Sequence, residues 1–188
     1  MILSFKASRT PKTAVLFQER LRECYFSCMN PYASQLGNQD PILILSETAS
    51  RLHGLAHAIG ATRIEQPAAP GKWSPREILI HLADCEIAFA FRYRQGLGEE
   101  NHVVQPFDQD LWAKRYSAYD AHQALQTFAV LRNWNLTLVR SLGPEQMSKP
   151  VRHPERGEMI FRELLETAAG HDINHLRQLE AIAGQSAA

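Results

Sequence analysis

The fold of this chain is decided by residues 74–96, which read SPREILIHLADCEIAFAFRYRQG. Its first four residues, Ser74-Pro75-Arg76-Glu77, form a capping-box pattern with proline at the first helical position, which is typical of a helix N-terminus. Apolar residues then recur every three or four positions on one helix face, namely at Ile78, Leu82, Cys85 and Phe89. This spacing predicts an amphipathic helix that ends near Gly96 and packs against other helices.

Three other segments show the same helical spacing. The first runs from about Pro41 to Ile59 with Asp40 as its N-cap, and the second runs from about Asp120 to Gly143. The third runs from about Met159 to Ala183 and stops at Gly184. In the segment 120–143 the predicted buried face consists of Leu125, Phe128, Leu131, Leu138 and Leu142. We therefore predict an all-α protein, a four-helix bundle with long connecting loops.

The loops between these helices carry their own signals. The connection from Leu97 to Tyr119 is too long for a simple hairpin between neighbouring helices, which indicates a crossover, a functional loop or both. No segment alternates apolar and polar residues long enough to predict a strand, but short extended pieces are expected near residues 101–107 and 148–154.

Composition excludes several classes of protein. The chain has 188 residues, which fits roughly one domain, and its 20 basic and 20 acidic residues give a formal net charge of zero. With 45% hydrophobic residues it is neither a disordered polyelectrolyte nor a disulfide-rich miniprotein. The lack of basic excess argues against nucleic acid as a partner, and no apolar run reaches the roughly 18 residues of a membrane helix. Three cysteines, an odd number, favour a reducing compartment, so we expect a cytoplasmic protein.

Residues 1–28 differ from the rest of the chain. They carry five basic residues against two acidic ones, and their apolar residues make no clean helical stripe. Met29 then opens a new stretch of sequence. We expect residues 1–28 to be an N-terminal extension outside the native domain, and residues 29–188 to form that domain.

Histidine spacing provides the main chemical signal. His171 and His175 are four residues apart within the apolar stripe of the last helix, so both imidazoles face the same side. Buried imidazoles need partners, which a metal ion or hydrogen bonds within the core would supply. His81 lies on or beside the buried face of residues 74–96 and completes a three-histidine set. Three neutral nitrogens and an open position suit zinc or nickel rather than magnesium or calcium.

Other candidate ligands are weaker. His53 and His57 are also four apart, but they lie one position off their helix stripe and are expected to be exposed. Cys85 could be a fourth ligand beside His81, although a buried cysteine is more often a small apolar residue. His153 could cover a site from above, but a surface turn is the better interpretation of its loop. Three carboxylates near the histidines could orient an imidazole, namely Asp84, Glu86 and Asp172.

Aromatic residues are concentrated near the long connection. Such residues could wall an apolar pocket or could simply pack in the core, and the set comprises Phe107, Trp112, Tyr116 and Trp134.

Several of these motifs together resemble one family. The segment from Trp73 to Asp84 resembles the Trp-Ser/Thr-x-x-Glu…His-x-x-Asp segment of DinB-like proteins, and the segment from Gly170 to His175 is similar to their closing His-x-x-x-His helix. The stretch from Val104 to Ala113, together with His153-Pro154-Glu155, resembles the YfiT branch, whose members include bacillithiol transferases. The resemblance covers about Met29 to Ala183.

This resemblance implies a four-helix bundle in up-down-down-up order that is often a homodimer. It also implies a divalent metal ion, zinc or nickel, on His81, His171 and His175. The activities known in the family include transfer of a low-molecular-weight thiol, as cosubstrate, to an electrophilic small molecule, and some members carry only a provisional hydrolase label.

The expected function is therefore a metal-dependent S-transferase that conjugates a low-molecular-weight thiol to an electrophilic small-molecule substrate. A metal-dependent hydrolase and a non-catalytic, metal-stabilised helical bundle remain as alternatives, because the same three ligands support all of them. The sequence assigns no general base and no other catalytic or cofactor-binding residue.

Overall fold

The computed structural model describes residues 30–185, so the predicted extension at residues 1–28 lies outside the described residues. Four long helices form the body: α3 (Pro41–Arg63), α4 (Pro75–Gly98), α6 (Ala121–Arg140) and α8 (Phe161–Gly184). The short elements are α2 (Ala33–Leu36), α5 (Gln109–Ala113), the 3-10 turn η1 (Tyr116–Ala118), α7 (Pro144–Met147), β1 (Pro150–His153) and β2 (Gly157–Ile160).

The helix starts follow the sequence signals. The Ser74 hydroxyl accepts from the backbone N–H of Glu77, and the Glu77 carboxylate accepts from the backbone N–H of Ser74 at 2.7 Å, which completes the predicted capping box. Asp120 caps α6 in the same way, accepting from the Gln123 backbone N–H at 2.7 Å. Asp40 caps α3 as predicted, but this helix extends to Arg63 across a break at residue 60.

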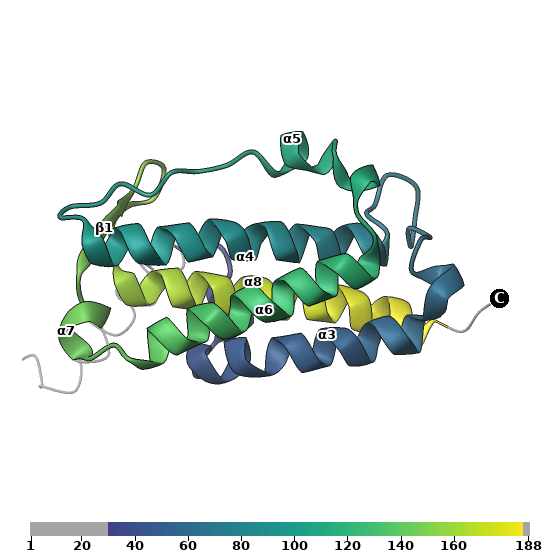
Figure 1. Cartoon of the computed structure of the whole chain (residues 1–188), viewed down its shortest axis with the longest axis horizontal. Coiled ribbons are helices and arrows are strands. Elements are labelled where there is room, and N and C mark those ends of the chain that lie inside the picture. Colours follow the sequence, from purple (N-terminus) through teal and green to yellow (C-terminus); the bar gives the residue numbers. More distant parts are fainter. Residues whose placement is uncertain (1–29, 186–188) are drawn as a thin grey trace, which may run out of the picture.

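The four long helices form the predicted bundle in up-down-down-up order. Figure 1 shows α3 and α8 running in one direction along the bundle and α4 and α6 in the other. Helices α4 and α6 can be parallel neighbours because the connection after α4 returns along the whole length of the bundle before α6 begins (Figure 1). The long connection therefore is a crossover.

A small hairpin corrects the predicted start of the last helix. Residues 157–160 pair antiparallel with residues 150–153, so Met159 and Ile160 belong to β2 and α8 begins at Phe161. The extended pieces predicted near residues 101–107 and 148–154 are confirmed, and they meet each other. The Val104 backbone N–H donates to the Arg152 carbonyl at 2.7 Å, and the Arg152 N–H donates to the His102 carbonyl at 2.8 Å.

The buried face of α6 also differs from the predicted one. Leu125 and Phe128 are buried as predicted, but Leu131, Leu138 and Leu142 are only half-buried. Arg132 and Asn135 take the inner positions instead, because both are hydrogen-bonded inside the bundle.

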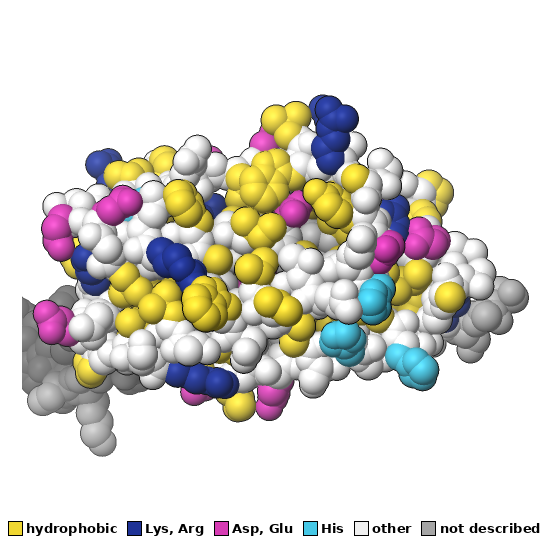
Figure 2. Space-filling view, in the orientation of Figure 1, with side chains coloured by type: hydrophobic (Ala, Val, Ile, Leu, Met, Phe, Trp, Pro, Cys, Tyr) yellow, Lys and Arg dark blue, Asp and Glu magenta, His cyan; other side chains and the backbone are white. Residues whose placement is uncertain are grey.

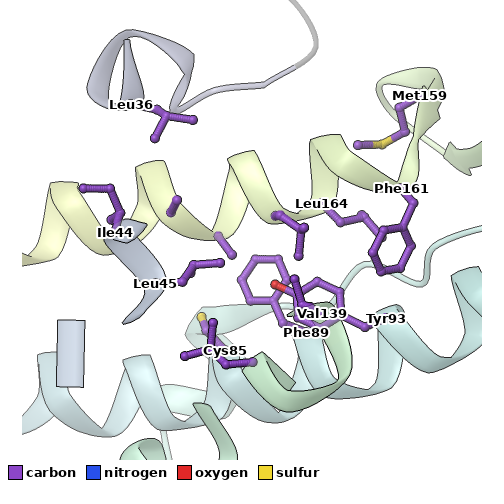
Figure 3. Packing of buried hydrophobic residues seen from close by; sticks show 14 of the residues in the cluster. Leu36, Ile44, Leu45, Cys85, Phe89, Tyr93, Val139, Met159, Phe161 and Leu164 are labelled. Atoms are coloured by element: carbon purple, nitrogen blue, oxygen red, sulfur yellow. The ribbon is translucent and has the colours of Figure 1, made fainter. Parts of the chain in front are cut away.

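The core consists of two hydrophobic clusters along the bundle. One cluster includes Cys85, Phe89 and Phe161 and surrounds the end of the bundle near the hairpin (Figure 3). The other includes Leu79, Leu176 and Leu179 at the opposite end. Buried polar side chains from α4, α6 and α8 lie where the two clusters meet. Among the described residues, no helix is both long and apolar enough to span a membrane.

Candidate functional site

Helices α4 and α8 bring the three predicted histidine ligands together. His81 lies on α4 and His171 and His175 lie on α8, and all three side chains are at most 6% exposed. The Nε2 atom of His171 lies 3.0 Å from Nε2 of His81 and 3.1 Å from Nε2 of His175. Three ring nitrogens therefore converge inside the bundle.

Neighbouring side chains hold the three rings in place. The Trp73 ring packs on His81 with a centroid separation of 4.8 Å, and Tyr32 meets His171 edge to face at 5.2 Å. Gln178 Oε1 accepts from Nδ1 of His175 at 3.1 Å. That bond puts the proton of His175 on Nδ1 and leaves the lone pair of Nε2 directed at the other two rings.

The donor atoms fit a divalent cation. Burial lowers the pKa of His81 to about 3 and that of His175 to about 4, and it lowers the pKa of His171 well below its ordinary value. The rings are therefore neutral at pH 7, and each ring nitrogen offers one in-plane lone pair or one proton. The His171 Nε2 atom cannot satisfy both of its close nitrogen neighbours with hydrogen bonds. A cation that accepts three nitrogen lone pairs would resolve this arrangement, and nitrogen ligands suit zinc or nickel.

Cys85 offers a second possible set of donors. Its Sγ lies 3.5 Å from Nε2 of His81 and 3.9 Å from Nε2 of His171, and donor atoms of these three residues lie within 4.8 Å of one another. Burial and the nearby carboxylate of Asp172 raise the pKa of this thiol. The two candidate sets of donors therefore share His81 and His171 and differ in the third residue, which is His175 in one set and Cys85 in the other.

The carboxylates predicted to orient an imidazole have other partners. Glu86 accepts from Nη2 of Arg132 at 2.8 Å, and Asp172 accepts from Nη1 of Arg132 at 2.6 Å. Within the described chain neither carboxylate bonds to a histidine, and Asp84 is half-buried with its pKa raised by burial. Gln178 fills the orienting role on His175, and sequence spacing did not single it out.

The other predicted candidates lie in different places. His53 and His57 are exposed on α3, as expected, and they are remote in sequence from the ring cluster. His153 is buried rather than part of a surface turn, and its Nδ1 accepts from the Glu155 backbone N–H at 3.2 Å.

The four aromatics do not form one wall. Phe107 and Trp112 pack together in the long connection with centroids 4.6 Å apart, whereas Tyr116 is buried beside Trp73. Trp134 is 64% exposed on α6 and takes no part in the site.

The sequence analysis did not predict the close contact between Tyr32 and Gly170 on α8. A Cβ at Gly170 would lie 2.6 Å from the Tyr32 carbonyl oxygen and 2.7 Å from the Tyr32 Cβ. Any larger residue at this position would push the segment of Tyr32 away from His171. The available signal was a glycine directly before His171 in the middle of a helix, where glycine is unfavourable unless another segment approaches closely.

This fold and this histidine cluster define a helical protein with a candidate metal centre between two helices. The model of the DinB superfamily matches residues 44–179, and the chain therefore belongs to the DinB superfamily. YfiT of Bacillus subtilis is 27% identical to it over 154 residues, which are 77% of this chain and 85% of YfiT. A relative from Oceanobacillus iheyensis is 28% identical over 113 residues, which are 60% of this chain and 66% of that protein.

Both relatives carry names that describe them, provisionally, as metal-dependent hydrolases. The solved structure of YfiT, described as a four-helix bundle of unusual topology, matches with a TM-score of 0.68 at 24% identity. The match covers 78% of this chain and 87% of YfiT and shows that the two proteins share a fold.

Proposed function

We propose that this protein is a metal-dependent S-transferase that joins a low-molecular-weight thiol to an electrophilic small molecule at His81, His171 and His175. The observation that carries the proposal is the convergence of three neutral Nε2 atoms at 3.0 and 3.1 Å. Zinc or nickel is the proposed metal, because both accept imidazole nitrogen.

The protein's own residues prepare this centre. Gln178 holds the proton of His175 on Nδ1, so that Nε2 can act as a ligand. Trp73 and Tyr32 cover the rings of His81 and His171 and exclude water from them. A cation held by three protein ligands would keep one coordination position open, where it would lower the pKa of a bound thiol or water.

In the proposed reaction the thiol sulfur attacks a carbon of a haloalkane. A sulfur–carbon bond forms, the carbon–halogen bond breaks, the halide leaves with the bonding electrons, and the thiol proton passes to solvent. The centre supplies a localised nucleophile, and the remaining requirement is a place for the second substrate.

A metal-dependent hydrolase is the second candidate function. The names of YfiT and of the Oceanobacillus iheyensis relative favour it, and an open metal position can also lower the pKa of water toward about 7. The two functions differ in their second substrate, and this difference can be measured.

The decisive experiment is a substrate screen on the full chain loaded with zinc or nickel. We expect conjugate formation from a thiol and a haloalkane only when thiol and metal are both present. Consumption of esters or amides with metal but without thiol would establish the hydrolase instead. Loss of thermal stability on chelation without turnover on either panel would identify a structural metal. The matched control is His53→Ala, which removes an exposed histidine and should change none of these results.

We also propose a homodimer that forms through the face of α4 and α6, because this face exposes apolar side chains. Ile87 and Phe91 on α4 are 47% and 57% exposed, and Val130 and Trp134 on α6 are 70% and 64% exposed. Figure 2 shows hydrophobic side chains spread across the face where these two helices lie. Exposed apolar patches of this kind mark interaction surfaces in otherwise polar proteins.

Sedimentation velocity tests this dimer. The wild-type chain should sediment as a dimer, and Trp134→Glu should shift it to the monomer, while Ser50→Glu on the exposed side of α3, outside the proposed interface, should not. A monomer at every wild-type concentration would contradict the dimer.

The proposed location is the cytoplasm, since the proposed thiol chemistry requires a reducing compartment.

A further inference from the structure

A half-buried arginine on α4 points back toward the histidine cluster. Arg92 lies seven residues after Cys85, so both side chains share one face of the helix. Its guanidinium carbon lies 5.6 Å from the ring centroid of Phe89 and 5.5 Å from that of Phe107. Phe89 is one turn after Cys85, so the guanidinium is folded toward the helix N-terminus, as helical side chains prefer.

This arginine retains unused donors. Nη2 of Arg92 donates to the Gln105 carbonyl at 3.0 Å, which is the one hydrogen bond of its side chain within the described residues. A guanidinium has five N–H donors in a planar fork, and this one lies against two aromatic rings.

A second half-buried arginine approaches the same region from the hairpin. Arg156 lies in the turn between β1 and β2. Burial raises the pKa of Tyr32, which packs against His171, and the positive charge of Arg156 offsets part of that shift. The charge of Arg156, together with burial, also lowers the pKa of Arg92. The hairpin is joined to residues 102–104 by the parallel bridge between Val103 and Arg152, so its turn continues beside the residues that follow Val104. Arg92 contacts this same stretch at Gln105 and Phe107, and the two arginines therefore border one segment of the long connection.

No acidic side chain of the described residues forms an ion pair with either arginine. Burial lowers the pKa of Arg156, and the charge of Glu155 offsets this only in part, since the two side chains do not come within ion-pair distance. Burial also lowers the pKa of the adjacent His153, so its ring supplies no negative charge. By contrast, Arg76, which is also half-buried, bonds to Glu65 at 2.8 Å. Two neighbouring, partly desolvated cations are unfavourable unless an anion joins them.

We propose that Arg92 and Arg156 form a subsite for a carboxylate group of the small molecule that reacts at the histidine cluster. This inference rests on the proposed function of that cluster. A planar guanidinium pairs best with a planar carboxylate through two parallel hydrogen bonds. Phe89 lies eight residues after His81, or about 12 Å along the helix, so the carboxylate and the reacting atom are separated by several bonds.

The test compares two matched pairs of substrates on the zinc-loaded full chain. One arm places the carboxylate on the thiol and compares 6-mercaptohexanoate with 6-mercaptohexanol, using a neutral haloalkane. The other arm places it on the electrophile and compares 6-bromohexanoate with 6-bromohexanol, using 2-mercaptoethanol. In one arm we expect the carboxylate to raise kcat/KM at least about tenfold, mainly through KM, since a charge-assisted bidentate contact of about 1.4 kcal/mol or more corresponds to that factor.

Variants connect this preference to the two arginines. The double variant R92Q/R156Q should bring the ratio of kcat/KM values close to one, while its zinc content stays at the wild-type level. Arg152→Gln is the matched control, because Arg152 is exposed on the same hairpin and its side chain has no hydrogen bond within the described residues. It should keep the full preference.

A binding measurement makes the subsite independent of turnover. An NMR titration of the metal-free chain with hexanoate should show saturable shifts that weaken about tenfold in R92Q/R156Q and remain in Arg152→Gln. If hexanoate binds in this way and no thiol reacts, the subsite stands and the proposed reaction fails. If thiols react without any preference for the carboxylate, or if the preference survives in R92Q/R156Q, the proposed reaction stands and the subsite is wrong. Absence of arginine-dependent hexanoate binding in the metal-free chain also overturns the subsite.

Discussion

His171→Ala is expected to lower the affinity for zinc more than about 100-fold, because even the partners that orient a metal ligand change affinity 10–100-fold. His171 is central to the cluster, since its Nε2 lies within 3.1 Å of two other ring nitrogens and within 3.9 Å of the Cys85 sulfur. Metal content after dialysis, measured by elemental analysis and by competition with a chelator, checks this. Stoichiometric zinc in the variant would remove His171 from the ligand set.

Two further variants decide which residue joins His81 and His171. We expect His175→Ala to lose zinc as His171→Ala does, and Cys85→Ala to keep it, because the nitrogen contacts are shorter than those of the sulfur at 3.5 and 3.9 Å. Cobalt substitution gives an independent check. A cysteine ligand adds an intense near-ultraviolet charge-transfer band that a site with three histidines lacks.

The answer bears directly on function. With three histidines as the ligands, one corner of a tetrahedral site remains for substrate, whereas four protein ligands would close it. Retention of zinc by His175→Ala with its loss in Cys85→Ala would make the histidine-only set wrong. Loss in both variants would indicate a closed site of four ligands and favour the structural alternative.

The sequence predicts the helices well because their signals are local. Ser74 and Asp120 carry the capping pattern within three residues of each helix start, and both caps are present. The hairpin at residues 150–160 was predicted only as an extended piece, because four-residue strands are too short for alternation to stand out. Met159 and Ile160 were consequently assigned to the helix that follows them.

The approach of His81 to His171 follows from spacing and burial, since each residue lies on the inner face of a long helix. The approach of Tyr32 depends on a contact between segments far apart in sequence, and only Gly170 hints at it. Arg132 was missed for a different reason. An arginine four residues after Phe128 looks like a break in an apolar stripe, and the sequence does not show that two carboxylates on other helices face it.

Arg132 connects α6 to the other three long helices. Its guanidinium donates to Glu86 on α4 at 2.8 Å, to Asp172 on α8 at 2.6 Å and to the Leu45 carbonyl on α3 at 3.0 Å. Asn135 also donates to Glu86 at 2.8 Å. The two carboxylates raise the pKa of Arg132, because they favour its charged form. All three charged side chains are at most 4% exposed.

Arg132→Met is therefore expected to lower the free energy of unfolding by about 3–5 kcal/mol, since it leaves two buried carboxylates without their cation. Urea denaturation of the metal-free chain measures this without a contribution from metal binding. Arg51→Met is the matched control, because Arg51 pairs with Glu180 at the surface with 40% and 45% of the two side chains exposed, and such pairs contribute at most about 1 kcal/mol.

A triple variant tests whether unpaired charge is the cause of the lower free energy of unfolding. If unpaired charge is the cause, the triple variant R132M/E86Q/D172N should recover a large part of the stability, because it removes all three charges together. A triple variant as unstable as Arg132→Met would show that the hydrogen bonds, rather than the charges, hold the helices. A loss within about 1 kcal/mol for Arg132→Met alone would contradict the role of this network. In that case other contacts would have to fix α4 and α8, and with them the distance between His81 and His171.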